Sequence, residues 1–336
     1  MEFIEVAARE AAGAIAAHSV RQGELVIRKG QRITDAHVDR LAENGVERII
    51  VARLGDGDKS EDEVAFELAR RAAGAHARAG DAFTGRSNIF SDARGVLRVN
   101  VEGIDRFNQV DERITIATLP AWRVVEPGEM IGTVKIIPFA VESDVVARVA
   151  SVSDDLISVA PFIPHQVGVV STLLPGLKSR TVAKTLRALE GRLDVSHSRI
   201  SREARVAHEI GAVADELKEM SAGEAELLIV FGASAVTDRR DVIPAAIEAA
   251  GGTLVHVGMP VDPGNLLVLG ELRGKPVIGA PGCARSPREN GFDWVLQRLL
   301  AHIPVTRADI MRMGVGGLLM EIGARGQPRD AAPEDS

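Results

Sequence analysis

The fold is decided by residues 226–286, which contain the segments Glu226-Leu-Leu-Ile-Val-Phe-Gly-Ala-Ser-Ala-Val-Thr-Asp-Arg-Arg-Asp241, Val261-Asp-Pro-Gly-Asn265 and Gly279-Ala-Pro-Gly-Cys-Ala-Arg-Ser286. Three apolar strand patterns lie in this stretch, and each of them leads into a loop of small residues. Ligands of open parallel sheets bind beyond the carboxyl ends of the strands, where such loops meet. The sequence therefore predicts a site for a phosphorylated small molecule at one edge of a sheet.

Strand and helix patterns alternate around this stretch, from Gln166 onward. We expect strands at 167–172, 194–201, 227–231, 253–257, 266–272 and 277–279, and helices at 179–189, 204–220, 242–250 and 289–301. This alternation implies parallel pairing through right-handed crossovers. The sequence thus predicts an α/β domain over residues 166–322, with a doubly wound, mostly parallel sheet.

Residues 1–160 have a different pattern, which predicts a smaller, strand-rich α+β domain. Thr34 is expected to cap a helix over 35–43, and Ser60-Glu-Asp-Glu63 fits a capping box that opens the next helix. Strand-like runs at 95–99, 114–117 and 131–137 surround an expected helix at 102–111. The polar tail 323–336 is rich in Pro and Gly, which predicts disorder.

Composition narrows the function classes. The chain has 336 residues, a formal net charge of −7, 3% aromatic residues and no tyrosine. This balance argues against a nucleic-acid partner, which favours basic surfaces and stacking aromatics. No apolar run approaches the ~20 residues of a membrane span, so we expect no membrane partner. The N-terminus lacks a signal-peptide pattern and Cys283 is the single cysteine, so we expect a cytoplasmic protein without disulfides.

The loop after the strand at 227–231 begins with Gly232, Ala233 and Ser234. Small residues let backbone amides approach a ligand, and the Ser234 hydroxyl adds a donor. The loop then leads into a helix, whose start presents unpaired N–H groups and positive partial charge. These residues are therefore candidates for contact with a phosphate group.

Two carboxylates follow in the same loop, and each has two interpretations. Asp241 is either the N-cap of the next helix or the ligand of a hydrated Mg²⁺, which makes it the candidate catalytic residue. Asp238 lies mid-loop without an evident capping role, and it either contacts a ligand or is a plain loop residue. Arg239 and Arg240 either pair with phosphate or are solvated.

The remaining candidates lie at three other strand ends. Asp262, Pro263, Gly264 and Asn265 form either a plain tight turn or a turn in which Gly264 admits a ligand that Asp262 or Asn265 contacts. Pro281 and Gly282 bring the backbone near anything bound. Cys283 is either a nucleophile or, since no histidine is near in sequence, a small spacer. Ser171 and Thr172 either contact a ligand through their hydroxyls or simply end the first strand of the domain.

The chain resembles the molybdopterin-binding domain family at these residues. That family includes molybdopterin adenylyltransferases, molybdenum insertases and competence-damage proteins. The resemblance rests on the ordered segments Val167–Thr172, Gly232–Asp241, and Gly258-Met-Pro-Val-Asp-Pro-Gly-Asn265 with Gly274-Lys-Pro-Val-Ile-Gly-Ala-Pro-Gly282. A second similarity, from Gly23 to Val46, is to the segment that precedes the binding domain in molybdenum insertases. As a whole the chain looks like the molybdopterin-binding half of molybdenum-cofactor nucleotidyltransferase fusion proteins.

The resemblance implies a protein that binds molybdopterin or the molybdenum cofactor and acts in its biosynthesis or delivery. It implies homo-oligomers and a nucleotidyltransferase or molybdoenzyme partner. An alternative is a Mg²⁺-dependent adenylyltransferase or molybdate-inserting enzyme, and a further one is a nucleotide phosphoanhydride hydrolase of the competence-damage type. Leu173-Leu174 stand where the family has Gly-Asp, and this missing carboxylate favours binding over adenylyl transfer.

Overall fold

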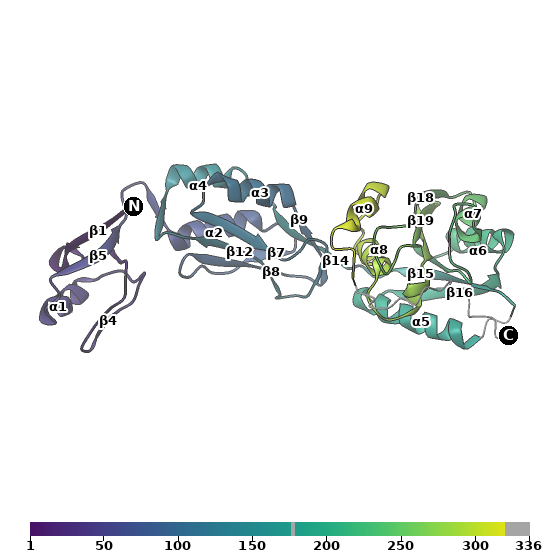
Figure 1. Ribbon diagram of the computed structural model, residues 1–336, viewed down its shortest axis with the longest axis horizontal. Coiled ribbons are helices and arrows are strands. Elements are labelled where there is room, and N and C mark those ends of the chain that lie inside the picture. Colours follow the sequence, from purple (N-terminus) through teal and green to yellow (C-terminus); the bar gives the residue numbers. More distant parts are fainter. Residues whose placement is uncertain (176–178, 320–336) are drawn as a thin grey trace, which may run out of the picture. The chain divides into compact units, whose positions relative to one another are not determined.

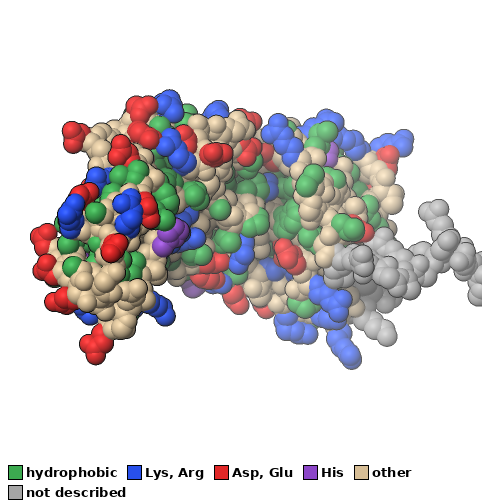
Figure 2. Space-filling model, turned by 60° about the vertical axis from the view of Figure 1, so that its left-hand side comes forward, with side chains coloured by type: hydrophobic (Ala, Val, Ile, Leu, Met, Phe, Trp, Pro, Cys, Tyr) green, Lys and Arg blue, Asp and Glu red, His purple; other side chains and the backbone are tan. Residues whose placement is uncertain are grey.

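The computed structural model describes residues 1–175 and 179–319 of the chain (Figure 1). Its internal contacts divide the protein into two compact units, Met1–Pro161 (unit 1) and Phe162–Ser336 (unit 2). The tail predicted to be disordered, 323–336, lies outside the described residues. Acidic and basic side chains are interspersed over the face that Figure 2 shows. Within the described ranges, no helix combines the length and apolar character that a membrane crossing requires.

Unit 1 begins with a small sheet and one helix. The elements are β1 (Glu2–Ala7), β2 (Ile15–Ala16), β3 (Val20–Gln22), β4 (Leu25–Ile27), α1 (Asp35–Glu43) and β5 (Arg48–Arg53). β5 pairs antiparallel with β1 and β2, and β3 pairs with β4. Thr34 caps α1 as predicted, because its hydroxyl accepts from the His37 amide. Leu25 and Leu41 are fully buried in the core of this part.

The rest of unit 1 contains three further sheets and three α-helices. The elements are β6 (Asp58–Ser60), α2 (Glu61–Ala72), β7 (Ala77–Ala79), β8 (Arg86–Ser91), β9 (Gly95–Val99), α3 (Val101–Val110), β10 (Ile114–Thr118), β11 (Val124–Val125), β12 (Met130–Ile136), β13 (Ala140–Glu142), α4 (Ser143–Ala150) and β14 (Ile157–Pro161). The largest of these sheets has the order β10-β12-β8-β7, the second has the order β11-β9-β14, and β13 pairs with β6 in the third. The predicted capping box is present, since Ser60 and Glu63 bond each other's amides.

Unit 2 is built on a mixed six-stranded sheet of order β16-β15-β17-β20-β19-β18. The strands are β15 (Gln166–Leu173), β16 (Arg199–Ala207), β17 (Leu227–Phe231), β18 (Thr253–Val257), β19 (Val268–Leu272) and β20 (Lys275–Ala280). β16, β15, β17 and β20 are parallel neighbours. β19 pairs antiparallel with β20 and with β18, so β19 alone runs against the other five strands of this sheet. The α/β class is confirmed.

The antiparallel part has a local cause. Leu272 pairs with Lys275, so Arg273 and Gly274 alone connect β19 to β20. Both of these residues have positive φ, 55° and 74°, which is the backbone of a tight hairpin turn. A parallel pair would need a crossover of a dozen or more residues. The strands predicted at 266–272 and 277–279 are joined by such a short connection, and the parallel pairing expected from the alternation does not hold for them.

Helices cover both faces of the sheet (Figure 1). The helices are α5 (Ser179–Leu193), α6 (Ile210–Ala222), α7 (Val242–Ala249), α8 (Gly291–Leu300) and α9 (Arg307–Met311). α5 and α8 share one core cluster through residues such as Leu189 and Val295. α6 and α7 share another through Leu217 and Ile247. The sheet is therefore buried between two helical layers.

The predictions for residues 194–220 were wrong in their boundaries. The strand is β16, Arg199–Ala207, and α6 begins only at Ile210. Val206, which falls within the helix predicted at 204–220, lies instead on β16 opposite Thr172 of β15. Pairing with the neighbouring strand outweighs the local helical spacing here, since β-structure depends on tertiary partners.

Candidate functional site

A cavity of about 130 Å³ lies at the carboxyl edge of the sheet in unit 2. β15, β17 and β20 end at this edge because they are parallel neighbours. The cavity is lined by residues 232–236, Leu266, residues 280–282 and Arg285. It thus contains five of the residues predicted from the sequence: Gly232, Ala233, Ser234, Pro281 and Gly282. Two loops from separate strand ends meet in one place.

Thr172 holds the first of these loops. Its side chain is 1% exposed, and Oγ1 accepts a hydrogen bond from the Ala233 amide at 2.7 Å. The same oxygen lies 2.8 Å from Nδ1 of His208. A buried hydroxyl with two partners has little capacity left for a ligand. Thr172 therefore positions the loop 232–236 and does not line the cavity.

Ser171 has a different environment. It is 3% exposed, and in the described structure its Oγ has no hydrogen-bond partner. Ser171 pairs with Phe231 across β15 and β17, so the two side chains point to the same face of the sheet. Buried hydroxyls are normally hydrogen-bonded, and an exception calls for an explanation.

Arg285 is the charged residue of the cavity, and the sequence analysis did not assign it a role. Nη2 donates to the Gly232 carbonyl at 2.7 Å and Nη1 to Oγ1 of Thr185 at 3.0 Å. The guanidinium carbon lies 5.7 Å from the centre of the Phe231 ring. Burial lowers the pKa of the Arg285 guanidinium. The sequence could have indicated this residue, because Arg285 follows Pro281-Gly282 closely and so lies at the same end of β20.

A second arginine fixes the turn that carries Arg285. Nε of Arg192 on α5 lies 2.6 Å from Oδ1 of Asp293 on α8. The same guanidinium donates to the carbonyls of Ala284 at 3.0 Å and Ser286 at 2.7 Å. The backbone on both sides of Arg285 is thereby held against α5.

The carboxylate of Asp241 is used within its own loop. Asp241 occupies the N-cap position of α7, yet its side chain bonds no amide of that helix. Oδ2 accepts instead from the amides of Thr237 and Asp238 and from the Thr237 hydroxyl. These bonds, that of the Thr237 amide first, lower the pKa of Asp241. The carboxylate therefore closes the loop before the helix rather than the first turn of the helix itself.

Asp238 and Asp241 do not line the cavity. Oδ1 of Asp238 accepts from Nε of Arg240 at 2.6 Å, and this bond lowers the pKa of Asp238. The interpretation of Asp241 as a ligand of Mg²⁺ would be supported by further metal-binding side chains near it. Among residues 1–175 and 179–319, however, no three His, Cys, Asp or Glu side chains form a group suited to a metal ion.

The turn 261–265 packs against protein rather than lining the cavity. Gly264 has φ 142°, and a Cβ there would lie 2.7 Å from the Gly291 nitrogen at the start of α8. The Gly291 amide donates to the Pro263 carbonyl at 2.8 Å, and the Asn265 side chain donates to the Met259 carbonyl. The Asp262 amide donates to the Gly317 carbonyl. Only Leu266, directly after the turn, reaches the cavity.

Cys283 lies next to the cavity but does not line it. Its side chain is partly buried, and burial raises the pKa of the thiol. A thiol with a raised pKa is a poor nucleophile near neutral pH. This environment suits the small spacer that the sequence suggested as one of two readings.

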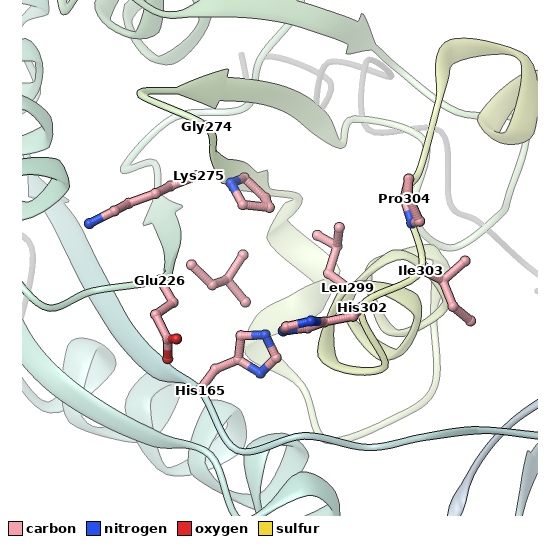
Figure 3. A pocket seen from close by; sticks show the side chains of 10 residues that line it. His165, Glu226, Gly274, Lys275, Leu299, His302, Ile303 and Pro304 are labelled. Carbon is pink, nitrogen blue, oxygen red and sulfur yellow. The ribbon is translucent and has the colours of Figure 1, made fainter.

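A larger cavity, of about 400 Å³, lies at the opposite edge of the same sheet, where β15, β17 and β20 begin. Figure 3 shows the rings of His165 and His302 close together, with Glu226 and Lys275 also lining the cavity. The two ring centres are 4.8 Å apart, and Nδ1 of His165 donates to the Ile163 carbonyl at 2.6 Å. No sequence pattern indicated this cavity, because its two histidines are 137 residues apart (302 − 165).

Comparisons with known proteins add little about this site. A family model described as a domain of unknown function, DUF8806, matches residues 5–53, which lie in unit 1. A search of curated proteins found no match. A solved structure of the molybdopterin biosynthesis MoeA protein from Pyrococcus horikosii is 13% identical, with a TM-score of 0.29, over 92% of this chain and 75% of that chain. A TM-score at this level does not establish a common fold.

Proposed function

We propose that unit 2 binds a small phosphorylated molecule at the carboxyl edge of its sheet. The ligand we propose is molybdopterin or the molybdenum cofactor, bound during the biosynthesis or delivery of that cofactor. One observation carries the proposal: the loops 232–236 and 280–282, which resemble two separate motifs of the molybdopterin-binding family, line one cavity. Loops of small residues at this edge of an α/β sheet are where ligands of such sheets bind.

The size of the cavity limits what can enter it. Its volume of about 130 Å³ is below the roughly 300–1,000 Å³ of pockets that enclose a whole small ligand. The cavity accommodates a phosphate group but not a complete pterin. In the proposed complex the phosphate enters the cavity, and the rest of the ligand contacts its exposed rim at Ser234, Ala235 and Gly282.

The proposed role is to hold the ligand rather than to transform it. The segment after β15, Leu174-Pro-Gly-Leu-Lys178, contains no carboxylate in its sequence. Oδ2 of Asp241 accepts from the amides of Thr237 and Asp238, and Asp241 does not line the cavity. If Asp241 activated a nucleophile or oriented Mg²⁺, its carboxylate would have to lie within reach of the ligand. Binding through amides and a buried cation has no such requirement.

Titration of the full chain with molybdopterin under anaerobic conditions tests the proposal. Gly282→Val adds an apolar side chain at a residue that lines the cavity, and nothing lies within 4 Å of a Cβ at this position. We expect saturable binding to the wild type and at least tenfold weaker binding to this variant. Lys275→Ala, in the cavity at the opposite edge, is the matched control and should bind as the wild type does.

Two results would contradict the proposal. One is the absence of saturable binding by the wild type, and the other is a loss of binding in Lys275→Ala but not in Gly282→Val. Release of pyrophosphate from Mg²⁺-ATP in the presence of molybdopterin would show adenylyl transfer, and would overturn the role of a ligand holder.

A further inference from the structure

Two arginines are associated with the turn Gly282–Arg285: Arg192 on α5 bonds its backbone, and Arg285 belongs to it. The partners of the two guanidinium groups differ in charge. Arg192 has the carboxylate of Asp293 at 2.6 Å. Arg285 bonds only neutral acceptors, the Gly232 carbonyl and the Thr185 hydroxyl, and it lies over the ring of Phe231. Within the described residues no carboxylate oxygen lies within 4.0 Å of the Arg285 guanidinium, since no ion pair includes it.

A partly buried cation without a counter-ion is unfavourable, because burial removes water without supplying an opposite charge. Arg285 nevertheless lines the cavity, and its two contacts to the protein leave further N–H groups of the guanidinium unused. Such a fork of donors matches the oxygens of a phosphate group. The cavity therefore already contains the charge that an anion needs.

Ser171 is a second and independent observation. Its Oγ is buried and without a partner, and it lies on the face of the sheet that also carries the Phe231 ring. Arg285 covers that ring. Ser171 itself does not line the cavity. In the proposed complex, an oxyanion bound at Arg285 on this face is the acceptor for the unpaired hydroxyl. One ligand would thus neutralise the Arg285 guanidinium and accept a hydrogen bond from the Ser171 hydroxyl.

We infer that Arg285 is the anion-binding residue of the cavity, and that it binds a phosphate monoester directly, without a bridging metal ion. This inference rests on the proposed function and deepens it, since it names the residue and the chemical group of the ligand. The Gly232 and Thr185 contacts hold the guanidinium in place while its remaining N–H groups face the phosphate. The turn that presents Arg285 is fixed by Arg192 and changes little on binding.

The experiment uses inorganic phosphate as the probe and the full chain as the protein. Thermal unfolding is followed at pH 7.5 over increasing phosphate, at constant ionic strength set with NaCl and with EDTA present. A ligand that binds only the folded state raises the unfolding temperature in a saturable way. We expect this saturable rise for the wild type and at least a tenfold weaker apparent affinity for phosphate in Arg285→Met. Arg285→Lys keeps the charge but loses the paired N–H donors of the guanidinium, so its affinity should be intermediate.

Arg240→Met is the matched control, because Arg240 pairs with Asp238 on the exposed part of the same loop. It should respond to phosphate as the wild type does. Ser171→Ala should also weaken phosphate binding, by a smaller factor than Arg285→Met. If Arg285→Met does not fold, Arg285→Lys and Ser171→Ala carry the test. Acetate replaces phosphate in a parallel series and should give a much smaller rise in unfolding temperature.

The outcomes separate this inference from the proposed function. Equal phosphate stabilisation of wild type, Arg285→Lys and Ser171→Ala, or no saturable stabilisation of the wild type with EDTA present, would overturn the assignment of Arg285. If molybdopterin binds wild type and Arg285→Lys equally, the proposed function stands and the inference fails. If phosphate binds through Arg285 but molybdopterin does not bind at all, the inference stands and the proposed ligand is wrong.

Discussion

Arg192 and Asp293 form an ion pair between α5 and α8 although 101 residues separate them in the chain. Nε and Oδ1 are 2.6 Å apart, and the side chains are only 9% and 10% exposed. The remaining donors of Arg192 bond the carbonyls of Ala284 and Ser286. One ion pair thus joins two helices to the turn that carries Arg285.

The first prediction is that Asp293→Asn destabilises unit 2 strongly. Removing the charge leaves the Arg192 guanidinium buried without its counter-ion, and breaking such a pair costs about 3–5 kcal/mol. The free energy of unfolding in urea measures the effect. Asp144→Asn breaks an exposed pair with Arg148 in unit 1 and should change stability little. Equal effects of the two substitutions would contradict the structural role of Arg192.

The second prediction concerns Thr172→Val, which keeps the shape of the side chain and removes its oxygen. The Ala233 amide then loses the acceptor that now lies at 2.7 Å. A buried donor without a partner costs about 1–3 kcal/mol. We expect this loss in urea unfolding, together with weaker phosphate binding, because the loop 232–236 is no longer held. Thr172→Ser retains the oxygen and should restore most of both properties.

The third prediction contrasts two glycines of the predicted site. Gly264 has φ 142° and touches Gly291, so Gly264→Ala should cost about 1–3 kcal/mol from backbone strain alone. Gly282 has open space around a Cβ, so Gly282→Ala should leave the unfolding temperature nearly unchanged. Ligand binding should respond in the opposite order when it is measured well below the unfolding temperature. A stable Gly264→Ala variant would show that the turn does not need to approach α8 so closely.

The fourth prediction is a pH dependence that comes from His256 on β18. Burial lowers the pKa of His256 below its ordinary value of 6.5, and the charges of Arg307 and Arg239 lower it further. Since the unfolded chain binds this proton more readily, the stabilisation is complete above about pH 6.5. It is lost as the pH falls through the lowered pKa. Unfolding in urea at pH 7.5 and 5.5 should therefore show a larger loss of stability in the wild type than in His256→Gln.

The sequence predicted the helices best where a cap fixes them locally. Thr34 and Ser60 each bond an amide three residues ahead, and both helices begin where these residues predict. Strand pairing was less accessible. β16 begins at Arg199 because it pairs with β15. No residue between 194 and 210 indicates this pairing by itself. The antiparallel pairing of β19 with β20 likewise depends on the positive φ of Arg273 and Gly274, which form the turn between them.

For the site, the sequence alone indicated the strand ends that could carry a ligand, because small residues follow apolar strands at Gly232 and at Pro281-Gly282. Only the tertiary structure decided which of the candidate residues share the cavity. It placed Gly264 against α8, turned the Asp241 carboxylate into its own loop and brought Arg285 over Phe231. The physical reason is that a side chain's partners come from whichever strands and helices pack beside it. Those neighbours are fixed by burial of the whole sheet and not by adjacent residues in the chain.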